Sequence, residues 1–162
     1  MKILSLILIA IIVFLLLLLI IGLLLPQKRF AKETVTFPFD IKNVWDIITN
    51  NEDYAWRSDL SKIEILNDGN SWVEYNTNGS SINFSILKKD YLKEYNFSME
   101  NNIFTGQFSS TYKKDIDGNT VVEFVESISI KNPIIRSLSY LFFNIKKFQN
   151  IYINDLKKKI NS

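Results

Sequence analysis

Three side chains in this sequence could carry acid–base chemistry, namely those of Glu126, Asp59 and Tyr95. Glu126 interrupts an otherwise apolar alternation, so its carboxyl is expected to point inward with its apolar neighbours. A carboxyl removed from water must be hydrogen-bonded, ion-paired or neutral, because burying an isolated charge is very costly. A raised pKa would suit proton transfer. An ion pair with Arg57 or Arg136 would instead indicate a structural role, and this second interpretation is favoured.

A second group of residues could orient the polar end of a ligand. The planar guanidinium of Arg57 presents a fixed fork of donors that suits a carboxylate or phosphate, and Trp56 stands next to it in the sequence. The structural interpretation is that Trp56 docks on a sheet while Arg57 pairs with Asp59, Glu64 or Glu74. The structural interpretation is favoured, because an ion pair that stabilises the fold needs no ligand.

Aromatic residues at alternating positions form the third candidate set. Such residues commonly line sites for hydrophobic ligands, but they are equally common at the inward-facing positions of a packed sheet. The sequence therefore leaves undecided whether the interior is hollow or filled. The set comprises Trp72, Phe84, Tyr95, Phe97, Phe108 and Tyr112.

Several classes of site are excluded by composition. The 162 residues include no Cys and no His, so a thiol nucleophile, a disulfide, a Ser-His-Asp triad and a histidine-bound metal are all absent. We therefore expect neither a metal nor a cofactor. Lys and Arg total 19 against 17 for Asp and Glu, which argues against a nucleic-acid-binding protein, because such proteins carry a strong basic excess.

The elements that must position these residues are mainly strands. Glu33–Phe39 alternates in hydrophobicity and is predicted to be a strand. Asn78-Gly79 and Asp117-Gly118 are hairpin signals, because Asn, Asp and Gly tolerate positive φ. The pattern predicts a long antiparallel meander whose further strands are Lys62–Leu66, Ser71–Asn76, Ser81–Lys88, Lys93–Glu100, Phe104–Lys114 and Thr120–Ile130.

Helices are predicted in the sequence after the first strand and after the last strand. Asp40 is a plausible N-cap for a short helix, and residues 51–56 are expected to form a second helical or turn segment. Asn132 and Pro133 begin a helix approaching 28 residues, which is expected to bury its apolar stripe against the sheet. The stripe consists of Ile134, Leu138, Leu141, Ile145, Phe148, Tyr152 and Leu156, and that of the short helix of Ile41, Val44, Trp45 and Ile48.

The N-terminal segment Ile3–Leu25 is apolar and uncharged. As a helix its 23 residues would cover the roughly 30 Å hydrocarbon thickness of a bilayer. The interpretation is an uncleaved anchor over residues 1–27, followed by one domain over residues 28–162. Lys28, Arg29 and Lys32 outnumber Lys2, so the positive-inside tendency places the domain in the cytoplasm.

The order of these elements, together with short sequence signals, resembles one superfamily. The signals lie at positions 56–60, 63–64, 72–74, 104–106, 118–120, 126 and 132–136. With them the chain resembles the START/Bet v 1-like (SRPBCC) superfamily, in its polyketide cyclase/dehydrase and lipid-transport branch, which includes membrane-anchored members. The resemblance implies an α+β helix-grip fold, in which a curved antiparallel sheet of about seven strands wraps a long C-terminal helix and encloses an apolar pocket.

Three functions follow from this reading. The leading hypothesis is a single-pass membrane protein whose domain binds or carries a hydrophobic small molecule such as a lipid, an isoprenoid or a polyketide. The aromatic set would line the pocket together with Trp56, Arg57 and Glu126. The first alternative is a cyclase- or dehydratase-type enzyme using Glu126, Asp59 or Tyr95. The second is a non-catalytic structural module with a filled pocket.

Overall fold

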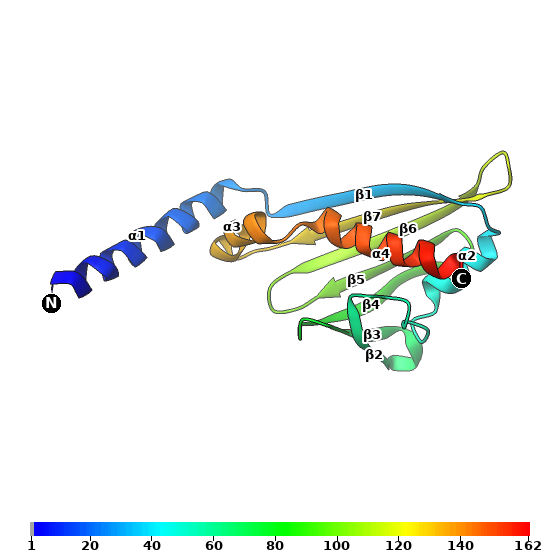
Figure 1. The fold of residues 1–162 in the computed structure, drawn as a ribbon, viewed down its shortest axis with the longest axis horizontal. Coiled ribbons are helices and arrows are strands. Elements are labelled where there is room, and N and C mark those ends of the chain that lie inside the picture. Colours follow the sequence, from blue (N-terminus) through cyan, green and yellow to red (C-terminus); the bar gives the residue numbers. More distant parts are fainter. Residues whose placement is uncertain (1) are drawn as a thin grey trace.

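The computed structural model describes residues 2–162, and most of them form one open antiparallel sheet with helices against it (Figure 1). The strands pair in the order β1-β7-β6-β5-β4-β3-β2, so β1 and β2 are the two edges. The strands are β1 (Lys28–Phe37), β2 (Leu60–Leu66), β3 (Ser71–Asn76), β4 (Ser81–Asp90), β5 (Glu94–Glu100), β6 (Thr105–Lys114) and β7 (Thr120–Ser129). The helices are α1 (Lys2–Leu24), α2 (Ile41–Thr49), α3 (Pro133–Phe142) and α4 (Ile145–Ile160).

The predicted meander is confirmed, and its turns form where the sequence indicated them. Gly79 and Gly118 adopt φ values of 85° and 82°, a region that costs glycine little because it has no Cβ. Asp40 caps α2 as expected, since its side chain accepts a hydrogen bond from the N–H of Lys42 at 2.9 Å.

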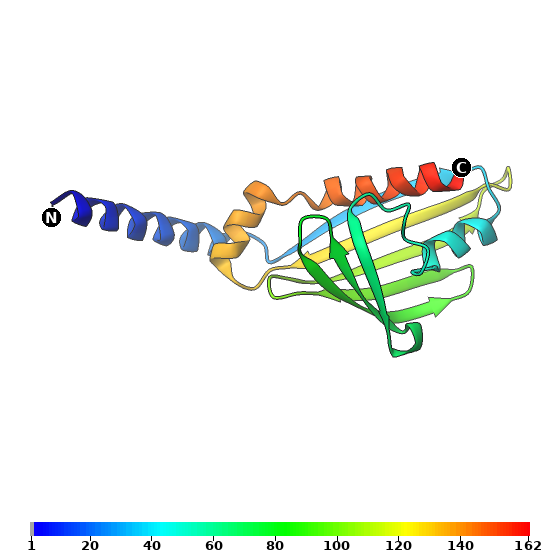
Figure 2. The ribbon, with the colours of Figure 1, turned by 60° about the horizontal axis from the view of Figure 1, so that its bottom comes forward.

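The core lies on the concave side of the curved sheet, under α2 and α4 (Figure 2). Trp72 and Phe84 are opposite one another on β3 and β4, and Phe97 faces Phe108 across β5 and β6. Alternation places all of these side chains on one face. Phe97 is partly buried, and the buried members of this core besides Trp72, Phe84 and Phe108 are Phe37, Val44, Trp45, Ile48, Tyr95, Met99, Tyr112, Val122, Phe124, Ile153 and Leu156.

The prediction of one long C-terminal helix is wrong. The helix breaks at Phe143 and Asn144, both of which have extended backbone conformations, and the Asn144 side chain caps a new helix by accepting from the N–H of Lys147 at 3.1 Å. Only the second part, α4, lies along the sheet, whereas α3 packs against α1. Leu141 is consequently 71% exposed instead of buried.

One smaller boundary also differs from expectation. β1 begins at Lys28 and not at Glu33, because β7 is long enough to pair with it through Lys28↔Ser129. Residues 51–56 form turns, which is one of the two forms expected for this segment.

The N-terminal helix α1 projects away from the sheet (Figure 1). It is long and apolar enough to cross a membrane, with a mean hydropathy of 3.7 over an 18-residue stretch. Within it the buried residues are Leu18 and Gly22, which lie in its last turns.

Candidate functional site

Arg57 is the centre of a charged cluster at the concave side of the sheet. Its Nε and Nη2 donate to the two carboxylate oxygens of Asp59 at 3.0 and 2.9 Å. Nη1 and Nη2 also reach Glu74, with distances of 3.5 and 3.4 Å. The expected pairing with Asp59 and Glu74 is therefore present, while Glu64 pairs instead with Lys62 at 2.9 Å.

The charges in this cluster stabilise one another. Glu74 is buried, and its Oε1 also accepts a hydrogen bond from Trp72 Nε1 at 3.1 Å. Burial alone would lower the pKa of Arg57, but the carboxylates of Glu74 and Asp59 raise it above its usual value. The guanidinium also lies 5.0 Å from the centre of the Tyr152 ring. Arg57 thus has its carboxylate partners within the protein, as the structural interpretation requires.

Trp56 lies beside this cluster and leaves one polar atom without a partner. Its ring centre is 5.5 Å from that of Tyr152, and its Nε1 is a buried donor with no acceptor among residues 2–162. The hollow beneath it has a volume of only about 30 Å³, and Arg57, Trp72 and Phe97 are among the residues that line it. A space of this size holds about one water molecule.

The six aromatic residues proposed as a cavity lining pack against one another or against neighbouring rings. Phe97 stacks on Phe108 with ring centres 4.7 Å apart, and Trp72 stacks on Phe84 at 5.1 Å. Tyr112 meets Trp45 edge-on at 5.0 Å. Of the two interpretations left open by the sequence, the structure favours the filled core at these positions.

Tyr95 lies in the same packed layer and is 1% exposed. Burial raises its pKa to about 12, against the opposing effect of a 3.4 Å hydrogen bond from Asn51 Nδ2. A phenol with this pKa keeps its proton at neutral pH. Asp59 is held by Arg57. Neither side chain is therefore free to act as a base.

Glu126 points inward but does not make the ion pair that was expected. It lies between Ala31 of β1 and Phe108 of β6 in the sheet register. Arg57 is bound by its two other carboxylates, and Arg136 donates to backbone carbonyls. Burial raises the pKa of Glu126 to about 7; the charge of Arg57 acts against this and that of Glu74 adds to it. The carboxyl is thus a partly buried group that titrates near neutrality.

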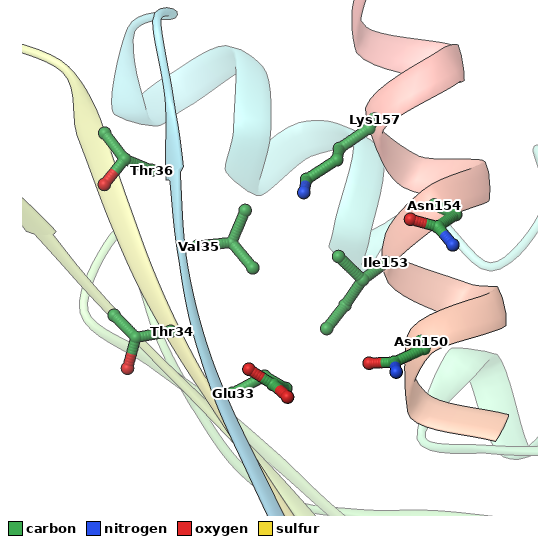
Figure 3. Close-up of a pocket in the computed structure, with 8 residues that line it drawn as sticks. All are labelled: Glu33, Thr34, Val35, Thr36, Asn150, Ile153, Asn154 and Lys157. Carbon is green, nitrogen blue, oxygen red and sulfur yellow. The ribbon is translucent and has the colours of Figure 1, made fainter. Parts of the chain in front are cut away.

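A larger hollow lies between β1 and α4, and we call it the β1–α4 groove (Figure 3). Its volume is about 430 Å³, and it is open to solvent. At its base Val35 and Ile153 point toward each other, and Lys157 extends from α4 toward β1 (Figure 3). The residues lining it are Glu33, Thr34, Val35, Thr36, Asn150, Ile153, Asn154 and Lys157.

The main chain of β1 forms one wall of this groove. The N–H of Ile130 donates to the carbonyl of Gln27 at 3.0 Å, which extends the β1–β7 register by one pair. Alternate residues of an antiparallel strand bond to the same neighbour, so the odd-numbered residues of β1 bond to β7. The N–H and C=O groups of Thr34 and Thr36 therefore face the free edge, although their side chains point away from α4 (Figure 3).

The opposite wall is a polar row on α4. Asn150, Asn154 and Lys157 follow one another at steps of four and three residues, so they share one flank of the helix. Glu33 is bound by Lys146 at 3.0 Å, whereas Lys157 has no ion-pair partner among residues 2–162. Sequence reasoning missed this groove, because the same spacing of polar residues is expected on any solvated helix face.

No cluster of acidic side chains within residues 2–162 could hold a metal ion. The candidate sites are therefore the Arg57 cluster, Glu126 and the β1–α4 groove.

Comparisons with known proteins identify the fold. No family model matches the chain, and no curated protein sequence matches it. Solved structures do match. A START superfamily protein from Mycobacterium smegmatis aligns with a TM-score of 0.61 and 12% identity, over 82% of this chain and 97% of that one.

Two further structures align with a TM-score of 0.65 and 8% identity. Norcoclaurine synthase from Thalictrum flavum, in complex with dopamine and hydroxybenzaldehyde, matches over 83% of this chain and 87% of its own. The di-domain ARO/CYC protein BexL, from the BE-7585A biosynthetic pathway, matches over 84% of this chain and 51% of its own. The chain therefore has the helix-grip fold of START and Bet v 1-like proteins, as the sequence predicted. At these identities the likeness concerns the fold alone.

Proposed function

We propose that this protein is a membrane-anchored, non-catalytic binding module that recognises an extended peptide in the β1–α4 groove. One observation carries the proposal: the groove on the outside of the domain has a volume of about 430 Å³, whereas the hollow beneath Trp56 has about 30 Å³. A ligand can enter the first as it stands, while the second has room for only about one water molecule.

The form of the groove favours a peptide in strand conformation. An edge strand presents unpaired N–H and C=O groups, and an added strand satisfies them while pockets beside it select side chains. Thr34 and Thr36 offer such groups. The side-chain amides of Asn150 and Asn154 can form hydrogen bonds with the other edge of the bound peptide. The wall opposite β1 is thus polar along its length.

The charge of the groove favours an acidic peptide. The carboxylate of Glu33 is bound by Lys146. Lys157 extends into the groove as a cation without a carboxylate partner among the described residues. An Asp or Glu side chain of the peptide would pair with it, and this choice of partner would be sensitive to salt.

The membrane part of the proposal rests on α1. Its 23 residues are apolar except for Lys2 and Ser5, and only two of them are buried. A helix of this composition that is not covered by protein is stable when lipid surrounds it. The groove would then be held on the side of the membrane where the domain lies.

Binding can be tested with the full chain in lipid nanodiscs and an immobilised library of peptides that alternate Val or Thr with Asp or Glu. Thr34→Pro removes an N–H that faces the free edge, where proline is tolerated, so it should weaken binding without unfolding the domain. Lys157→Met should weaken binding and abolish its salt dependence. Lys113→Met, an exposed lysine on β6, is the matched control.

Peptides that bind all four proteins equally would disprove the groove as the site. Circular dichroism and thermal unfolding of each variant would show whether any loss of binding comes from loss of the fold.

A second candidate function is the binding of a hydrophobic small molecule beneath Trp56. It is supported by the unpaired Trp56 Nε1 and by the fold, because the norcoclaurine synthase structure holds dopamine and hydroxybenzaldehyde. Entry would require Trp56 and Tyr152 to move apart. Solvent extraction of the full chain followed by mass spectrometry tests this: a compound that is retained by the wild type and lost in Phe97→Trp would favour this function over peptide binding.

An enzymatic function has less support. Glu126 has a suitable pKa of about 7, but a general acid or base must reach its substrate within hydrogen-bond distance. Glu126 lines neither the hollow beneath Trp56 nor the β1–α4 groove.

A further inference from the structure

Helix α3 is joined to the end of α1 by close backbone contact. Gly22 is buried against it, and a Cβ added there would lie 1.8 Å from the carbonyl oxygen of Pro133. Ser137 Oγ donates to the carbonyl of Leu18 at 2.6 Å. Figure 2 shows α3 running across the end of α1, outside the sheet. The two helices therefore pack together as one unit.

Arg136 completes this joint. Its guanidinium is 4% exposed and donates to the carbonyls of Gly22 and Leu25 at 2.8 and 3.2 Å. It also reaches the carbonyls of Ile130 and Lys131 at 2.9 and 2.7 Å. The last carbonyls of a helix have no partner within the helix and carry a partial negative charge, so a buried cation at this point both caps α1 and attaches it to the domain.

The outer surface of α3 is apolar and uncovered within residues 2–162. Leu141 and Phe142 are 71% and 83% exposed, and Leu138 and Tyr140 are also exposed. Phe30, at the start of β1, is a further exposed aromatic residue. Exposed apolar surface of this extent indicates contact with a partner or a membrane.

The position of α3 along α1 favours a membrane over a protein partner. The contact begins at Leu18, seven residues before the apolar run ends at Leu25. At 1.5 Å per residue, the first half of α3 lies beside the last roughly 10 Å of the segment that would cross the bilayer. Its second half contacts Pro26 and Arg29, just after that segment. That depth corresponds to the boundary between acyl chains and headgroups, where short amphipathic helices lie and where Tyr is enriched.

We propose that α3 is an interfacial helix that rests in the same bilayer leaflet in which α1 ends, with Leu141 and Phe142 inserted among the acyl chains. The inference rests on the membrane anchor in the proposed function, but it is independent of the groove. In this arrangement the protein contacts the bilayer in two places, through α1 and through α3. The orientation of the domain relative to the membrane is then fixed by α3 and by the Arg136 joint.

The sequence contains no Cys, so single cysteines can be spin-labelled without background. We would label Phe142→Cys in the full chain, reconstituted in vesicles of phosphatidylcholine with some phosphatidylglycerol. Phe14→Cys, exposed on α1, reports the bilayer core, and Ile116→Cys, fully exposed at the turn after β6, reports water. Collision with oxygen and with a water-soluble nickel complex measures depth.

The label at position 142 should be more accessible to oxygen than to the nickel complex, as at position 14. The label at position 116 should be more accessible to the nickel complex. If position 14 lies in lipid while position 142 resembles position 116, the inference is overturned and the anchor stands. If positions 14 and 142 both react as in water, the inference and the anchor fail together. Low accessibility of position 142 to both reagents would indicate a protein partner or a second copy, and would also overturn it.

A matched pair of variants tests the joint. Gly22→Leu places a side chain where Pro133 lies, so it should shift the label at position 142 toward nickel accessibility. Ala10→Leu, at an exposed position of α1, should leave the label unchanged. An unchanged signal in Gly22→Leu would show that α3 is not positioned by this contact.

Discussion

Asp155 of α4 holds Ser58 by two hydrogen bonds across 97 positions of sequence. The same carboxylate oxygen accepts from the backbone N–H of Ser58 at 2.8 Å and from its hydroxyl at 2.5 Å. Asp155 is buried. Burial would raise its pKa, but the hydrogen bonds from Ser58 lower it below the usual value. This contact fastens the segment that carries Trp56 and Arg57 to the C-terminal helix.

We therefore expect Asp155→Ala to destabilise the domain by about 3 kcal/mol, because hydrogen bonds to a charged group contribute more than neutral ones and the donors of Ser58 lose their acceptor. Asp53→Ala removes an exposed ion pair with Lys159 and should cost less than about 1 kcal/mol. Chemical denaturation of both variants measures the difference. Equal losses would contradict the role given to Asp155.

The pair of Arg57 and Glu74 should show strong non-additivity. Arg57→Met leaves the buried carboxylate of Glu74 without its cation and is expected to cost about 3–5 kcal/mol. In the double variant Arg57→Met/Glu74→Gln no charge remains unpaired at position 74, and the amide oxygen can still accept from Trp72. The double variant should therefore be more stable than Arg57→Met alone, as measured by urea unfolding. An additive further loss would refute the coupling.

Glu126 should make stability depend on pH near neutrality. Its pKa is about 7 in the folded protein against 4.5 for an ordinary glutamate. The unfolded chain therefore releases the proton first, so stability falls as the pH rises from about 4.5 to 7. The total loss is on the order of 3 kcal/mol.

Glu126→Gln has no proton to lose and should show a flatter profile over this window. Glu123→Gln, on the outward face of the same strand and paired with Lys32, should keep the wild-type slope. Unfolding measured at several pH values distinguishes the two variants. A wild-type slope in Glu126→Gln would show that another group is responsible.

The side of the membrane on which the domain lies remains the prediction made from charge, namely the cytoplasmic side. It depends on Lys28, Arg29 and Lys32 following the apolar segment and on Lys2 preceding it. Ile116→Cys is fully exposed and should react with a membrane-impermeant maleimide only after the cells are permeabilised. Labelling in intact cells would reverse the assignment, and the cysteine-free wild type provides the blank.

Local sequence determined the features that depend on neighbouring residues. The apolar run of α1, the hairpins at Gly79 and Gly118 and the alternation within the strands were all predictable, because each depends on side-chain period or on backbone freedom at one position. The pairing of Arg57 with Asp59 and Glu74 was among the expected ones. The helix-grip fold itself was implied by the resemblance to START/Bet v 1-like proteins, which rests on the order of these elements and on the short sequence signals.

Tertiary structure alone decided how the last helix divides and what its parts contact. The spacing of the apolar residues in the C-terminal segment continues unchanged across Phe143 and Asn144, where the helix breaks. The spacing therefore could not show that α3 would pack against Gly22 while α4 packed against the sheet. The same holds for the Ser58–Asp155 bond and for the β1–α4 groove, whose walls lie more than a hundred residues apart. A periodic pattern specifies that a face must be buried, but only the packed chain specifies the surface that buries it.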